Sequence, residues 1–126
     1  MRNRLNTFLL LCSALAFASC GQEHKAKSIA RDFISTYQVK GDRFGMSFSK
    51  LDSTKHIAKE NIQAMRQHVS EIPQFQKGIT FEKGDIPNTL LYITARYKVL
   101  TPQGDTLSCD NTFYFDQKLE RIIAVK

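Results

Sequence analysis

The apolar positions near the start of the chain follow the spacing of a helix. Between residues 22 and 39 they recur every three or four positions, so they share one helical face. These positions are Ala26, Ile29, Ala30, Phe33, Ile34 and Tyr37. Lys40 and Gly41 then supply a basic last turn and a glycine able to take the left-handed conformation that ends many helices. The pattern predicts one helix over residues 22–39.

The same spacing returns further along the chain and predicts a second helix. It runs over residues 54–72, where Ser53 is available as the N-cap and Pro73 as the stop. The intervening residues 43–52 contain apolar side chains at possible helical spacing, but also a glycine, two serines and an aspartate. We expect them to form a short helix or an ordered loop.

From residue 79 onward the apolar positions alternate with polar ones, which is typical of strands. Turn residues divide this half of the chain into short segments. The pattern predicts four strands, over residues 79–82, 89–101, 105–115 and 119–125.

The register of one hairpin follows from its loop. Pro102-Gln103-Gly104 suits a type I turn followed by a left-handed bulge residue, which places Thr101 opposite Asp105. Counting outward gives a nearly apolar face with the pairs Val99–Leu107, Tyr97–Cys109, Ala95–Asn111, Ile93–Phe113 and Leu91–Phe115. The opposite face carries the pairs Lys98–Ser108, Arg96–Asp110, Thr94–Thr112 and Tyr92–Tyr114. A slip of one residue would exchange the two faces, so this register is strongly specified.

This order of elements predicts an α+β fold. Two N-terminal helices pack on a four-stranded antiparallel meander, with the first helix on the apolar face of the sheet. The chain has 126 residues, of which 42% are hydrophobic and 24% charged, and this fits one globular domain.

The first residues have the layout of an export signal. Arg2 and Arg4 form a basic start, and residues 8–17 form an apolar segment shorter than the roughly 20 residues that span a bilayer. The net charge of the chain is +6, and these two arginines contribute to it. The other basic residues are interspersed with acidic ones, which argues against nucleic acid as a partner. Weak attraction to anionic lipid headgroups fits this charge better.

Two cleavage sites compete at the end of this signal. Phe17-Ala18-Ser19-Cys20 resembles a bacterial lipobox, in which the cysteine is acylated and becomes the N-terminus. Alternatively, cleavage after Ala18 would leave Cys20 as a thiol that could pair with Cys109. The position of Cys20 directly after the apolar segment, and before polar residues that can act as a tether, favours lipidation. We expect a lipoprotein signal peptide over residues 1–19 and one domain with a short tether over residues 20–126.

One segment carries a resemblance to a family. Ala30-Arg31-Asp32-Phe33-Ile34 and Tyr37, closed by Lys40-Gly41-Asp42 and followed by the meander, resemble the small cystatin-like and nuclear-transport-factor-like lipoproteins of bacterial envelopes. The resemblance implies a protein anchored through acyl chains such as palmitate, at the outer membrane. Most such lipoproteins have no assigned activity, and no family catalytic residue can be carried over.

The residues that bear chemistry predict no catalytic, metal or cofactor site. The three histidines, His24, His56 and His68, lack cysteine or carboxylate partners at ligand spacing. His56 and Glu60 are expected to form a surface pair on the second helix. Cys109 alternates with apolar residues, so a buried filler is favoured over a reactive thiol.

Two groups of residues are candidates for binding. Asn111 lies on the apolar face, where it either makes structural hydrogen bonds or belongs to a ligand pocket with Tyr37 and Tyr97. On the opposite face, an interaction surface is predicted from Tyr92, Arg96, Asp110 and Tyr114. The predicted function is a non-enzymatic module that binds a protein or a ligand. The alternative is a small-molecule binder or an enzyme that uses a cavity between helix and sheet.

Overall fold

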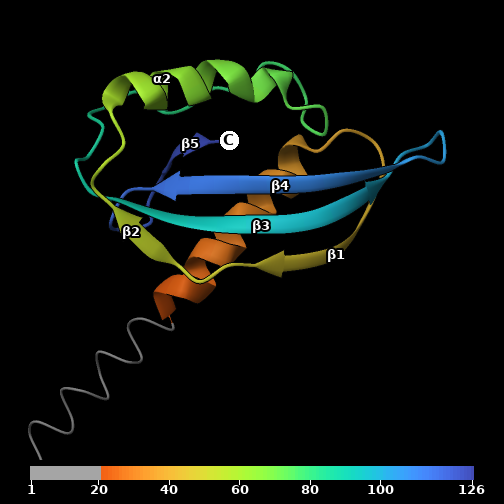
Figure 1. Cartoon of the computed structure of the whole chain (residues 1–126), viewed down its shortest axis with the longest axis horizontal. Helices are drawn as coiled ribbons and strands as arrows, with labels where there is room; N and C mark the ends of the chain where they lie inside the picture. Colours follow the sequence, from red (N-terminus) through yellow and green to blue (C-terminus); the bar gives the residue numbers. More distant parts are fainter. Residues whose placement is uncertain (1–20) are drawn as a thin grey trace, which may run out of the picture.

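The computed structural model describes residues 21–126, which form an α+β domain with two helices and a five-stranded antiparallel sheet (Figure 1). An N-terminal helix over residues 21–37 comes first. The elements that follow are β1 (Asp42–Phe48), β2 (Asp52–Thr54), α2 (Lys59–His68) with a 3-10 turn (Val69–Glu71), β3 (Leu90–Leu100), β4 (Thr106–Phe115) and β5 (Ile122–Val125). The strand order is β1-β3-β4-β5. β1 pairs with the last residues of β3, and β2 pairs with its first residues.

The hairpin of β3 and β4 confirms the predicted register pair by pair. Tyr97 lies opposite Cys109 and Arg96 opposite Asp110. The amide of Thr101 donates a hydrogen bond to the carbonyl of Asp105 over 2.8 Å, and Gly104 has a φ of 90°. This positive φ is the conformation that the bulge position of such a loop requires.

The prediction of a helix or loop over residues 43–52 is wrong, because β1 and β2 occupy this segment. β1 contains a bulge, because Gly45, with a φ of 67°, and Met46 both lie opposite Tyr97. Phe44, Met46 and Phe48 alternate in the sequence, but the bulge places Phe44 on one face of the sheet and Phe48 on the other. The sheet has five strands rather than four. The two helices of the domain are separated in the chain by β1 and β2.

The predicted strand over residues 79–82 is also wrong, since this segment has no regular structure. Ile79 is buried and Phe81 half-buried, while the polar residues beside them are largely exposed. The alternation thus reflects an irregular segment packed against the core, without strand pairing. The guanidinium of Arg66 lies 5.6 Å from the centre of the Phe81 ring and helps to hold it.

The second helix is shorter than predicted. It begins at Lys59 because Ser53, the expected N-cap, is paired with Leu91 in the sheet. Ala58 occupies the N-cap position without a side-chain hydrogen bond, and the chain leaves the 3-10 turn at Ile72, before Pro73.

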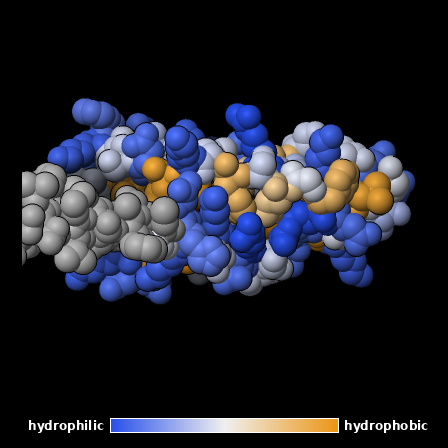
Figure 2. All heavy atoms as spheres, turned by 90° about the horizontal axis from the view of Figure 1, so that it is seen from below, coloured by the Kyte–Doolittle hydropathy of each residue, from blue (hydrophilic) through white to orange (hydrophobic). Residues whose placement is uncertain are grey.

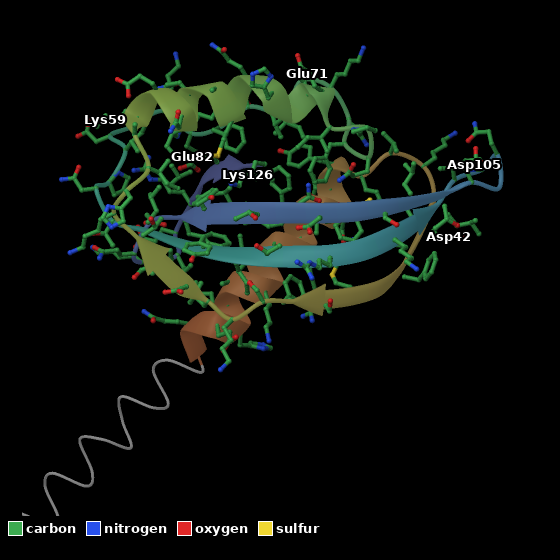
Figure 3. The ribbon with its side chains drawn as sticks, viewed as in Figure 1. Asp42, Lys59, Glu71, Glu82, Asp105 and Lys126 are labelled. Carbon is green, nitrogen blue, oxygen red and sulfur yellow. The ribbon has the colours of Figure 1, made fainter. Side chains whose placement is uncertain are left out.

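The two helices bury different faces of the sheet. The N-terminal helix lies behind β3 and β4 in Figure 1, and its Ala30, Phe33 and Ile34 share one core cluster with the apolar face, as predicted. The rings of Phe33 and Phe113 meet edge to face with centroids 5.5 Å apart. α2 lies along β5, and its Ile62 joins a second cluster on the other face (Figure 3). Of the two helices, only the first covers the apolar face.

Candidate functional site

The interaction surface predicted from the sequence is divided into a covered half and an open half. Tyr92 and Tyr114 face each other across β3 and β4, with ring centroids 5.9 Å apart. α2 packs over them, and Tyr114 is 5% exposed in the same cluster as Ile62. Tyr114 is therefore a core residue beneath α2 and is not available to a partner.

Arg96 and Asp110 lie on the half of this face that α2 does not reach. Arg96 Nε donates a hydrogen bond to Asp110 Oδ2 over 3.2 Å, and the two side chains are 75% and 58% exposed. A pair so open to water adds at most about 1 kcal/mol to stability. The guanidinium has five N–H donors, so it can bind a further acceptor while it keeps Asp110.

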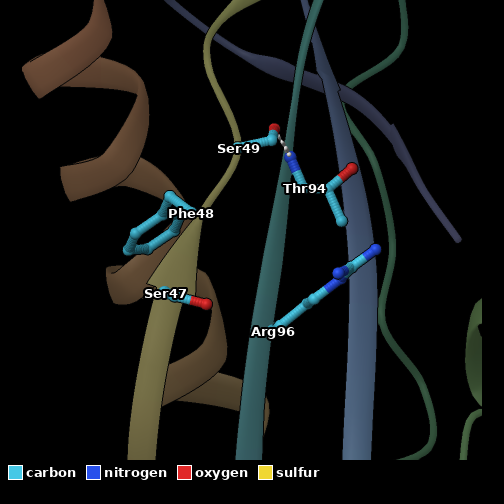
Figure 4. A pocket seen from close by; sticks show the side chains of 5 residues that line it. All are labelled: Ser47, Phe48, Ser49, Thr94 and Arg96. Atoms are coloured by element: carbon cyan, nitrogen blue, oxygen red, sulfur yellow. Dashed lines mark hydrogen bonds between the residues drawn. The ribbon is translucent and has the colours of Figure 1, made fainter.

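Two hollows flank Arg96. A cavity of about 280 Å³ lies where the chain passes from β1 to β2, lined by Ser47, Phe48, Ser49, Thr94 and Arg96 (Figure 4). The hydroxyl of Ser49 accepts a hydrogen bond from the amide of Thr94 over 2.9 Å, which fixes this connection against β3. A cavity of about 270 Å³ lies on the other side, where Gly45, Lys98 and Asp110 contribute to its wall.

Two exposed apolar side chains complete this surface. Phe44 is 48% exposed and Leu100 is 41% exposed, and no other large apolar side chain within residues 21–126 is exposed to this extent. Phe44 lies opposite Lys98, so both apolar side chains share the face of Arg96. We call this surface the open half-face; it consists of Phe44, Ser47, Arg96, Lys98, Leu100, Ser108 and Asp110.

Sequence reasoning identified only part of the open half-face. Arg96 and Asp110 were identified because the hairpin register is local. Phe44 and Leu100 were missed because their proximity depends on β1, which the sequence did not predict as a strand. The available signal was the alternation of Phe44, Met46 and Phe48 around Gly45, interpreted with a bulge.

The candidate pocket residues Tyr97 and Asn111 form a closed polar group in the core. Tyr97 Oη donates a hydrogen bond to Asn111 Oδ1 over 2.6 Å, and Gln74 Nε2 donates to the same oxygen over 3.2 Å. The three side chains are between 1% and 7% exposed. Burial raises the pKa of Tyr97, so its hydroxyl stays protonated and able to donate at neutral pH. This geometry fits the alternative in which Asn111 makes structural hydrogen bonds within the core.

Tyr37, the third candidate pocket residue, has other contacts. Its ring lies 4.7 Å from that of Phe33 between centroids, and its backbone carbonyl accepts a hydrogen bond from the amide of Gln76. The bridge between Gln38 and Phe75 next to it joins the end of the N-terminal helix to the segment after α2. These contacts give Tyr37 a packing role at the end of that helix.

Cys109 and the histidines are placed as ordinary structural residues. Cys109 is 5% exposed, and burial raises the pKa of its thiol, which keeps it in the unreactive protonated form. His56 precedes α2, so it does not share a helical face with Glu60; His68 instead pairs with Glu71 over 2.8 Å. Within residues 21–126, no group of three or more histidine, cysteine or acidic side chains is placed to hold a metal ion.

The predicted signal over residues 1–19 and the predicted lipidation site Cys20 lie outside the described residues. The first described residue, Gly21, is already helical, so the polar residues expected to form a tether belong to the N-terminal helix. Neither helix in the described part of the chain is long and apolar enough to cross a membrane.

Comparisons with protein-family models, with curated proteins and with solved structures find no match for this chain. The function is therefore inferred from the site itself. The open half-face combines a guanidinium, a carboxylate, hydroxyls and exposed apolar side chains, which are the groups of a non-covalent binding surface.

Proposed function

We propose that this protein is a lipid-anchored lipoprotein of the bacterial envelope, held at the outer membrane through an acylated Cys20. Its single α+β domain, of a cystatin-like type, has no catalytic role and binds another protein through the open half-face. Support for the anchor comes from the basic and apolar start of the chain and the lipobox-like segment before Cys20.

One observation carries the binding role: Phe44 and Leu100 are exposed on the same face as an Arg96–Asp110 pair that lies open to water. Apolar side chains with polar ones around them are typical of a protein interface. Arginine is also among the residues that contribute most to binding energy in such interfaces. Phe44 stands beside a glycine bulge on an edge strand, where packing within the domain does not need it.

The alternative, a ligand or substrate in a cavity between helix and sheet, has less support. Its polar residues would be Tyr97 and Asn111, and these bond to each other and to Gln74 in the core. A ligand would have to break these bonds before it could make its own. We therefore favour binding at the surface.

Photocrosslinking in intact cells tests the binding role. A benzophenone amino acid placed at position 44 should give discrete adducts, whereas the same group at Gln63, an exposed position on α2, should not. Arg96→Ala should weaken capture of the adduct partner by about tenfold or more, since truncation of an interface arginine often costs about 2 kcal/mol. Lys77→Ala, which removes an exposed charge elsewhere, is the matched control. Equal adducts from positions 44 and 63, or an Arg96→Ala variant that binds normally, would contradict the proposal.

The anchor is tested by mass and by fractionation. The protein purified from membranes should begin at Cys20 and carry acyl chains, and Cys20→Ser should move it to the soluble fraction. Two or more acyl chains bind a membrane stably, whereas a single chain binds only marginally. An unmodified chain that begins at Ser19, with Cys20 bonded to Cys109, would refute the anchor.

A further inference from the structure

We infer that the acylated protein stands on the membrane in a fixed orientation: the end of the domain formed by the start of the N-terminal helix and β2 rests on the lipid headgroups, and the β3–β4 hairpin points away. This inference rests on the proposed acylation of Cys20. It adds which surface of the domain meets the bilayer and which surface remains free.

The connection between the anchor and the domain is short. Gly21 is helical, and adjacent Cα atoms are only about 3.8 Å apart. The helix is held in the core from Ala26 onward, since Ala26 and Ala30 are both 0% exposed. Even if residues 21–25 unwound fully, they would reach only about 17 Å. The acylated residue therefore keeps this end of the domain close to the membrane.

β2 and the start of β3 lie at the same end of the domain as the start of the N-terminal helix. Gln22 and Glu23 share the wall of one surface hollow with Asp52 and Ser53 of β2 and with Leu91, near the start of β3. β3 then runs 11 residues away from this end, about 36 Å at the usual rise of a strand. The hairpin tip at residues 102–104 thus lies at the far end of the domain, as Figure 1 shows.

The anchored end of the domain carries several basic side chains. Exposed basic side chains lie on the first turns of the helix and on both sides of β2, at His24, Lys25, Lys50 and Lys55, with Glu23 and Asp52 among them. Figure 2 shows hydrophilic side chains around the start of the described chain. Each lysine near an anionic surface contributes about 1 kcal/mol of attraction. The membrane would therefore reinforce the orientation that the short connection imposes.

This orientation has a consequence for the open half-face. Leu100 is the last residue of β3, and Phe44 lies two pairs from it, so the apolar part of the surface is at the hairpin end. The surface is then held tens of ångströms from the lipid and remains accessible to a partner that is not itself in the membrane.

Fluorescence quenching in vesicles tests the orientation. Single cysteines are introduced as Ser53→Cys or Gln103→Cys in a Cys109→Ala background, labelled with a small fluorophore, and reconstituted as acylated protein. The vesicles contain phosphatidylethanolamine and phosphatidylglycerol, with a nitroxide on a fraction of the headgroups. The label at position 53 should be quenched, and the label at position 103 should keep the intensity it has with nitroxide-free lipid. Equal quenching at both positions, or stronger quenching at 103, would overturn the orientation.

A linker variant and a mass measurement separate the possible failures. Ten glycine and serine residues inserted between Cys20 and Gly21 should reduce the difference between the two labels; an unchanged difference would overturn the short connection as its cause. The mass of each sample reports acylation independently. An acylated protein without the difference overturns the orientation alone, whereas a protein without acyl chains overturns the proposed anchor and the orientation with it.

Discussion

Phe113→Ala is expected to lower the free energy of unfolding by about 3–5 kcal/mol. Phe113 is 0% exposed near the end of β4, where it faces Ile93 across the hairpin and meets the ring of Phe33 from the N-terminal helix. Its removal leaves a cavity between the helix and the sheet, which the packed elements on both sides cannot close. The loss is a large part of the 5–15 kcal/mol that holds a typical domain together.

Urea unfolding followed by circular dichroism measures this effect. Phe44→Ala is the matched control, because it removes the same side chain from a site that is 48% exposed, and it should change stability by no more than about 0.5 kcal/mol. If Phe113→Ala is too unstable to purify, Phe113→Leu should show a smaller loss in the same direction. Similar losses for Phe44→Ala and Phe113→Ala would mean that the core is not where we place it.

Asn111→Ala is expected to cost about 2–4 kcal/mol, because it leaves two buried donors without an acceptor. Both the hydroxyl of Tyr97 and the side-chain amide of Gln74 donate to Asn111 Oδ1, and all three side chains are buried. Tyr97→Phe removes only one donor and leaves the bond from Gln74 in place. It should therefore cost only about 1 kcal/mol.

The two variants also separate a structural role from a ligand pocket. If the role is structural, both variants lower the midpoint of urea unfolding, and Asn111→Ala lowers it more than Tyr97→Phe. The slope of the unfolding free energy against urea concentration stays unchanged. If Asn111 instead served a ligand, Asn111→Ala would leave the unfolding midpoint of the purified protein nearly unchanged. That result would favour the cavity alternative over binding at the open half-face.

Local signals in the sequence determined the N-terminal helix and the β3–β4 hairpin. The helix depends on spacing within one segment, and the hairpin register depends on a three-residue loop together with alternation on both sides. Each can be deduced from residues close together in the chain. For the same reason, Arg96 and Asp110 were identified correctly as an exposed pair.

The tertiary structure alone decided the features that join distant segments. β1 exists because β3, about 50 residues later, offers it a partner, and the bulge at Gly45 places Phe44 and Phe48 on opposite faces of the sheet. One of the two donors to Asn111, Gln74, lies 37 positions away on a segment without regular structure. α2 covers Tyr114 but stops short of Arg96, because the short helix packs along β5.

The open half-face thus depends on both the local sequence and the tertiary structure. The amino-acid sequence by itself determined which side chains share a face of the hairpin, because that alternation is a property of a single pair of strands. The packing of α2 on the sheet decided which half of that face stays open. The pairing of β1 with β3 decided that Phe44 belongs to the open half. Such packing depends on the summed burial of many distant side chains, which no short stretch of sequence encodes.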